Sequence, residues 1–106
     1  MNEFLERIRA LIGAGEVRIS DHGYDALAED RLTAREVVAG VQQALVVEEY
    51  PNYPKGPSIL LLQKDRAGAP IHVVWGIPRG YDEPVVLVTA YKPDPEQWDG
   101  SFMKRR

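Results

Sequence analysis

Two histidines are the side chains of this chain best suited to proton transfer near neutral pH. His22 lies in the first turn of a predicted helix, with Asp21 and Asp25 beside it in the sequence. His72 lies in the middle of a predicted strand. An imidazole can act as a general acid or base. The two side chains therefore predict acid–base chemistry if the fold brings their rings together in one cleft.

Each histidine also has a structural interpretation. The ring of His22 could bond to nearby backbone groups and thereby stabilise the start of its helix. The side chain of His72 lies on the side of its strand opposite the apolar face, where an adjacent strand or the chain end could cap it. For both residues the sequence leaves the structural and the chemical interpretation open.

The remaining motifs do not favour a different reaction. The chain has no cysteine, which excludes thiolate nucleophiles and cysteine-ligated metals. It has no Gly-x-Ser-x-Gly, Walker or dinucleotide-binding loop, and the histidine spacing matches no zinc motif. We therefore expect a site that uses neither a metal nor a cofactor.

The charge distribution limits the expected partners. The net charge is −3. Residues 1–50 carry five Arg/Lys and ten Asp/Glu (net −5), whereas residues 51–106 carry eight and six (net +2). Nucleic acids are bound largely through neutralised phosphates. Any contact with RNA would therefore have to use the second half of the chain, including its basic tail, residues 104–106.

The composition is typical of a soluble globular domain, with 44% hydrophobic and 27% charged residues. A length of 106 residues suits one core and one domain, over residues 1–106. Charges interrupt the apolar residues of the N-terminal region, and no run approaches the ~20 apolar residues of a membrane span. We expect a cytoplasmic protein that contacts no membrane.

Hydrophobic periodicity predicts the elements that must position these side chains. Apolar residues at helical spacing predict helices over residues 2–12, 21–29 and 34–44. Thr33 and Glu36 match a capping box at the start of the third helix. Alternating or apolar runs between turn residues predict strands over residues 46–50, 58–64, 70–77 and 85–91. Residues 17–19 fit either a short strand or an extended linker.

Helices that precede strands joined by short links predict an α+β fold, with N-terminal helices packed on one face of a four-stranded antiparallel meander sheet. In that sheet the apolar side chains at the odd positions 71–77 would face the helices, and His72 would face the other side. Tyr91 or Lys64 would be its cross-strand neighbours. The uncovered face of the sheet is therefore the predicted cleft.

Several segments resemble a known family. They comprise residues 19–22, 50–51 with 56–58, 70–75, and 88–95 followed by Trp98. In this order, and over residues 18–98, they resemble the bacterial family named domain of unknown function 4258. That family is in turn similar to the RelE/ParE and BrnT toxins, which place a small antiparallel sheet beside helices.

The resemblance implies a toxin-like endoribonuclease that works without a metal, or a degenerate relative of one. Such a reaction needs a base for the 2′-hydroxyl proton, an acid for the leaving oxygen and cations against the phosphorane charge. By correspondence with the family, His22, His72 and Tyr91 would be the catalytic residues. The residues expected to bind phosphate or RNA are Lys64, Lys92, Arg105 and Arg106.

The chain also departs from the family pattern. It has Ala26 and Asp30 where many relatives carry arginines, and it is acidic whereas ribonuclease toxins tend to be basic. The alternative hypothesis is a non-catalytic module that binds an antitoxin-like protein through the open sheet face or an edge strand. The acidic first half of the chain would suit a basic partner.

Overall fold

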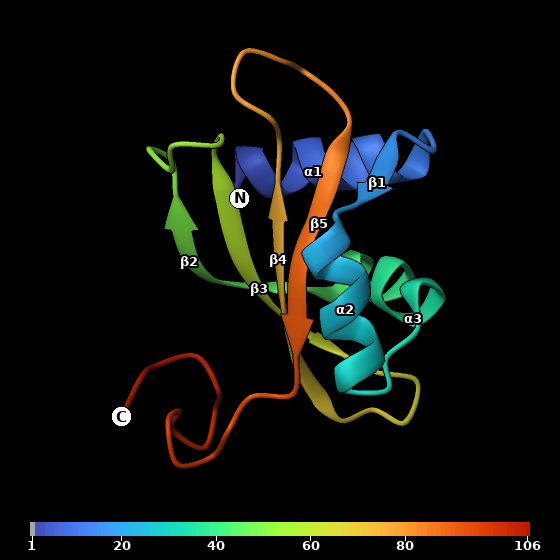
Figure 1. Ribbon diagram of the computed structural model, residues 1–106. Coiled ribbons are helices and arrows are strands. Elements are labelled where there is room, and N and C mark those ends of the chain that lie inside the picture. Colours follow the sequence, from blue (N-terminus) through green and yellow to red (C-terminus); the bar gives the residue numbers. More distant parts are fainter. Residues whose placement is uncertain (1) are drawn as a thin grey trace.

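Three α-helices and five strands make up the fold in the computed structural model, which describes residues 2–106 (Figure 1). Met1, the first residue of the predicted domain, lies outside the described residues. The helical elements are α1 (Glu3–Gly13), α2 (Asp21–Glu29), α3 (Ala34–Ala39) and the 3-10 helix η1 (Gly40–Gln43). The strands are β1 (Val17–Ile19), β2 (Leu45–Tyr50), β3 (Ser58–Lys64), β4 (Pro70–Gly76) and β5 (Val85–Tyr91).

All five strands belong to one mixed sheet, in the order β1-β5-β4-β3-β2. Strands β2 to β5 pair antiparallel with one another, but β1 lies parallel to β5, with Val17 opposite Val85. The predicted four-stranded antiparallel meander is therefore wrong. A strand of three residues carries little periodicity. Its partner lies near the other end of the chain, so nothing local in the sequence indicated the parallel pair.

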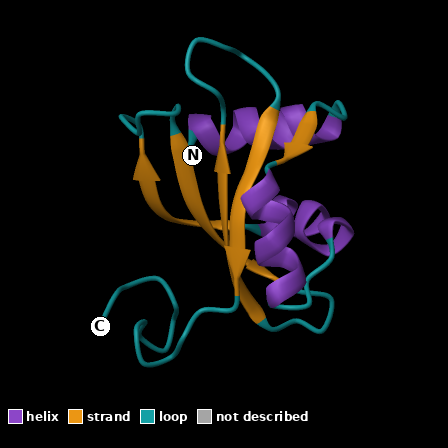
Figure 2. Cartoon of the chain, in the orientation of Figure 1, coloured by secondary structure: helices purple, strands orange, loops and turns teal. Residues whose placement is uncertain are grey.

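The core lies between the helices and one face of the sheet. Its sheet side includes Ile59, Leu61, Ile71, Val73, Trp75 and Leu87, and its helical side includes Leu5, Ile8, Leu27, Val37 and Val41. Figure 2 shows α1 crossing behind the strands, with α2 and α3 beside β5. Among residues 2–106 there is no helix with the length and apolar character that a membrane span requires.

The third helix begins as predicted but ends early. The Thr33 hydroxyl accepts a bond from the Glu36 N–H and the Glu36 carboxylate accepts one from the Thr33 N–H, so the predicted capping box forms. After Ala39 the chain tightens into η1 instead of continuing as an α-helix. At this point the Gln63 side-chain amide donates to the Val37 carbonyl at 2.8 Å. In a longer α-helix that carbonyl would accept from the residue four positions later.

Candidate functional site

The face of the sheet opposite the helices has a covered half and an open half. The C-terminal segment, residues 92–106, leaves the end of β5 and curls back at the lower left of Figure 1. Trp98 of this segment is 4% exposed, and its ring centroid lies 4.5 Å from that of His72 in an edge-to-face arrangement. The segment thereby covers the half of the face that contains His72.

His72 is completely buried, with an exposed fraction of 0%. Its Nε2 lies 2.8 Å from the Phe102 carbonyl oxygen and its Nδ1 lies 3.2 Å from the Tyr91 hydroxyl. A carbonyl only accepts, so Nε2 carries the hydrogen and Nδ1 accepts from Tyr91. Burial lowers the pKa of His72, and the nearby Arg105 acts in the same direction. A neutral ring with both nitrogens bonded is well suited to hold the segment in place.

A charged cluster attaches the last residues of the C-terminal segment to β2. The Arg105 guanidinium donates to both Glu48 carboxylate oxygens, at 3.0 and 3.2 Å, and lies 4.7 Å above the Trp98 ring. The Tyr50 hydroxyl also donates to Glu48. The bonds from Arg105 and Tyr50 lower the pKa of Glu48, whereas burial and the bond to Glu48 raise the pKa of Tyr50 to about 12. Arg105, a predicted phosphate ligand, is thus engaged with Glu48.

The open half of the same face contains a cleft of about 550 Å³. The start of α2 forms one wall, and the loop of residues 51–57 forms another. His22 is exposed and lies on the rim with Lys55 and Tyr53, and Ser58, Gly76 and Val86 belong to the floor. The cleft therefore combines an apolar floor with a rim that carries an imidazole and an ammonium group.

A row of cross-strand neighbours forms the floor. Ser58 lies opposite Gly76, Gly76 opposite Val86, and Val86 opposite Arg18. A Cβ atom at position 76 would lie 2.9 Å from the Ser58 Oγ, so the glycine keeps the floor hollow. Val17 and Ile19 pack against the core, so the exposed side chain of Arg18 projects on the side of the cleft.

The close contact between α2 and β5 positions His22. Ser20 caps the helix: its hydroxyl accepts from the Gly23 N–H at 2.9 Å and donates to the Leu87 carbonyl at 3.1 Å. A Cβ atom at position 23 would lie 2.6 Å from the same carbonyl oxygen. Only a glycine therefore lets the first turn of α2 approach the strand this closely. His22, one residue earlier, is held at the mouth of the cleft.

The structure places the two histidines in different halves of the face. Gly76, in the floor of the cleft, lies four residues along β4 from His72, which corresponds to about 13 Å at the rise of a strand. His72 is instead brought together with Tyr91, its neighbour on β5. His22 is brought together with Tyr53 and Lys55, neither of which the sequence indicated as a site residue.

The other predicted phosphate ligands lie outside the cleft. Lys64 ends β3 and lines a different cavity, and Arg106 donates to the Pro95 carbonyl at 2.7 Å. Lys92 follows β5, where its backbone N–H donates to Asp30 at 2.7 Å. Lys55 lines the cleft, and Arg18 lies opposite Val86 on the same face of the sheet. Their signal in the sequence was weak: Lys55 lies in a loop with three prolines, and such a loop is stiff enough to hold a side chain in place.

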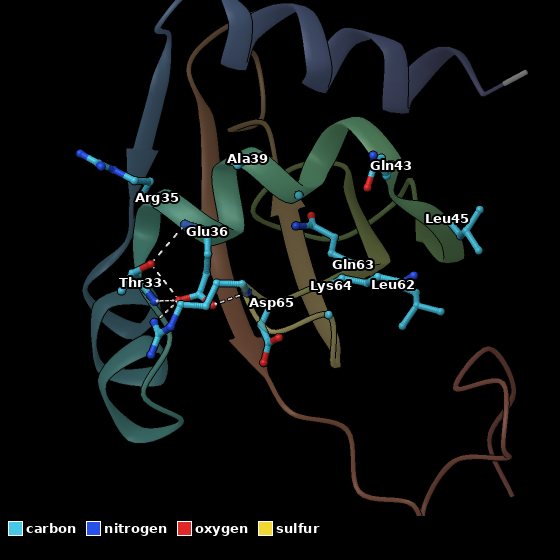
Figure 3. Close-up of a pocket in the computed structure, with 13 residues that line it drawn as sticks. Thr33, Arg35, Glu36, Ala39, Gln43, Leu45, Leu62, Gln63, Lys64 and Asp65 are labelled. Atoms are coloured by element: carbon cyan, nitrogen blue, oxygen red, sulfur yellow. Dashed lines mark hydrogen bonds and ion pairs between the residues drawn. The ribbon is translucent and has the colours of Figure 1, made fainter.

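A larger cavity of about 750 Å³ lies between α3, η1 and the end of β3 (Figure 3). Its buried carboxylate is already paired: Glu36 accepts from the Arg66 N–H and guanidinium, both at 3.0 Å, and from Thr33. Burial alone would raise the pKa of Glu36, but these bonds lower it to about 2. We take the smaller cleft as the candidate site because the exposed histidine lies there. Within residues 2–106 no group of three or more His, Asp or Glu could hold a metal ion.

A family model described as domain of unknown function (DUF4258) matches residues 19–92, well over half of the chain. The chain belongs to this family. The DUF4258 region contains α2, the loop of residues 51–57 and strands β2 to β5, and it ends at the residue after β5. Most of the C-terminal segment that covers His72 therefore lies beyond the matched region. No curated protein and no solved structure matches the chain.

Proposed function

We propose that this DUF4258 protein is a toxin-like, metal-independent endoribonuclease whose scissile phosphate binds in the open cleft. The observation that carries the proposal is the exposed imidazole of His22 on the same rim as the Lys55 ammonium group. A base at one concave site with an ammonium group, which can serve both as the acid and as the cation, meets the requirements of this reaction. Likeness to the RelE/ParE and BrnT toxins belongs to the same proposal.

The reaction is a transesterification within the RNA backbone. The His22 imidazole takes the proton of a 2′-hydroxyl group, whose oxygen then attacks the adjacent phosphorus. The bond from phosphorus to the 5′-oxygen breaks, and that oxygen takes a proton from the Lys55 ammonium group. The products are a 2′,3′-cyclic phosphate and a free 5′-hydroxyl. The positive charge of Lys55 stabilises the negative charge that builds up on the phosphorane oxygens.

His72 and Tyr91 have no step in this reaction, because their polar atoms bond to each other and to the C-terminal segment. The proposal thus assigns acid–base chemistry to one histidine and one lysine instead of two histidines. It also needs only local positive charge, so it is compatible with a net charge of −3.

The direct test is cleavage of a single-stranded RNA oligonucleotide by the purified protein in the presence of EDTA. We expect products with 2′,3′-cyclic phosphate ends. The cleavage rate of His22→Gln should be at least about 100-fold lower than that of the wild type. Glu29→Gln, an exposed change at the other end of α2, is the matched control and should retain the wild-type rate. Intact RNA with the wild-type protein, or cleavage that EDTA abolishes, would contradict the proposal.

One observation favours a second function, the binding of a basic protein segment without catalysis. Strand β2 is an edge strand of the sheet, and Leu45 at its start is 55% exposed. The backbone groups on such an edge can pair with an added strand. An antitoxin-like partner from the native host should then co-purify with the wild-type protein and be lost with Leu45→Asp. Recovery of the protein as a monomer without a partner argues against this function.

A further inference from the structure

Lys55 lies on a loop that is bonded to a neighbouring loop. Residues 51–57 and residues 77–84 lie at the same end of the sheet, at the top of Figure 1. The Ile77 N–H donates to the Pro57 carbonyl at 3.0 Å, and the Arg79 N–H donates to the Lys55 carbonyl at 2.9 Å. The backbone on both sides of Gly56 is therefore attached to the second loop.

Gly56 allows the two loops to come this close. Its φ is +137°, a conformation that favours glycine. A Cβ atom at this position would lie 2.1 Å from the Ile77 carbonyl oxygen and 2.7 Å from the Arg79 nitrogen. Lys55, the residue before it, thus occupies a backbone position that depends on the contact between the loops.

The side chain of Arg79 adds two bonds to the same loop. Its Nε donates to the Pro54 carbonyl at 2.9 Å and its Nη2 donates to the Tyr53 carbonyl at 3.0 Å. A guanidinium group is planar and permanently charged, so it can bind two neighbouring carbonyls at once. Arg79 does not line the cleft. Its three bonds hold the backbone of Lys55 and of the two residues before it.

We propose that Arg79 is a positioning residue for Lys55. By binding three consecutive carbonyls, of Tyr53, Pro54 and Lys55, it holds the ammonium group at the rim of the cleft, ready for an anionic ligand. The part of this inference that concerns a phosphate rests on the proposed function. Without the Arg79 guanidinium group the loop of residues 51–57 gains conformational freedom. Ordering this loop when a ligand binds then costs free energy, which lowers the affinity for the ligand.

Hydrogen exchange tests the clamp itself and needs no ligand. The Gly56 N–H donates to the Tyr53 carbonyl at 3.0 Å, within the clamped loop. We expect this amide to exchange about tenfold faster in Arg79→Gln, and less so in Arg79→Lys, which keeps one donor group. Arg35→Gln, an exposed change beside the other cavity, should leave it unchanged. Unchanged exchange in Arg79→Gln would overturn the clamp.

A double-mutant cycle tests whether Arg79 acts through Lys55. The probe is a single-stranded RNA oligonucleotide with one 2′-deoxy position at the cleavage site, which binds but cannot react. We expect Arg79→Gln to weaken its binding about fivefold in the wild type and not at all in a Lys55→Gln background. Equal weakening in both backgrounds would mean an independent action of Arg79 and would overturn the positioning role.

The two measurements separate this inference from the proposed function. If the wild-type protein binds no probe, the proposed function fails and the positioning role toward a phosphate fails with it. The exchange rate at Gly56 still decides whether the clamp exists. If the probe binds and Lys55→Gln weakens binding, but Arg79→Gln changes nothing, only the positioning role is overturned.

Discussion

His72 lies on the covered half of the sheet face and His22 lies beside the open half, so the two histidines have contrasting surroundings. His72 is buried under the C-terminal segment, and both its ring nitrogens are bonded within the protein. His22 is exposed at the mouth of a cleft that Lys55 also lines. By residue type alone, both side chains are equally suited to general acid–base chemistry. A segment from elsewhere in the chain therefore decides whether an imidazole is bonded within the protein or remains accessible.

The largest expected difference between the halves concerns stability. His72→Ala leaves the Phe102 carbonyl and the Tyr91 hydroxyl without their partner and opens a cavity, which should cost about 2–4 kcal/mol. His22→Ala should change the free energy of unfolding by less than about 0.5 kcal/mol, because the side chain is exposed. Urea denaturation at pH 8 measures both. Similar values for the two variants would remove the distinction between the halves.

A change in the floor of the cleft should affect binding more than stability. Gly76→Ala places a Cβ atom 2.9 Å from the Ser58 Oγ and narrows the hollow. We expect the dissociation constant of the 2′-deoxy probe to rise about tenfold. The control is Gly13→Ala, where a Cβ atom meets nothing within 4 Å. Unchanged binding with Gly76→Ala would show that ligands do not reach the floor.

The pH dependence of stability should report the covered half. Burial lowers the pKa of His72 in the folded state below its ordinary value of 6.5. The unfolded chain therefore binds the proton first as the pH falls below 6.5, and the free energy of unfolding decreases. His72→Gln should abolish this part of the pH dependence in denaturation series. If the free energy of unfolding of His72→Gln depended on pH below 6.5 as strongly as that of the wild type, His72 would not be the group responsible.

A second pH window distinguishes this effect from acid denaturation in general. The pKa of Glu36 is lowered from 4.5 to about 2, so its contribution to stability is complete above pH 4.5 and is lost as the pH falls toward 2. Glu36→Gln should remove the dependence in this lower window only. If Glu36→Gln also removed the pH dependence of stability assigned to His72, the titrations of Glu36 and His72 would be coupled.

The smallest expected effect belongs to the ion pair that attaches the C-terminal segment to β2. Arg105 is 62% exposed in its side chain, so its pair with Glu48 should contribute only about 0.2–1 kcal/mol. Arg105→Ala should therefore destabilise the protein much less than His72→Ala, and 1 M salt should reduce the difference from the wild type. A loss as large as that of His72→Ala would make Arg105 the main anchor of the segment.

The sequence predicted local features of the fold well where neighbouring residues carry the signal. The boundaries of β3 and β5 agree with the predicted strands because apolar runs end there at turn residues. The Thr33–Glu36 capping box needs only four consecutive residues and forms as predicted. The parallel pairing of β1 was missed, since it joins segments from opposite ends of the chain.

By itself the sequence determined the helical and strand periods, the face of β4 on which His72 lies, and the absence of thiol chemistry. Only the tertiary structure decided which histidine stays accessible. The polar atoms that bond to His72 belong to residues 19 and 30 positions later in the chain, and the loop that carries Lys55 is bonded to Ile77 and Arg79. The reason is physical: periodicity and capping depend on near neighbours, whereas burial and site geometry depend on which distant segments pack together.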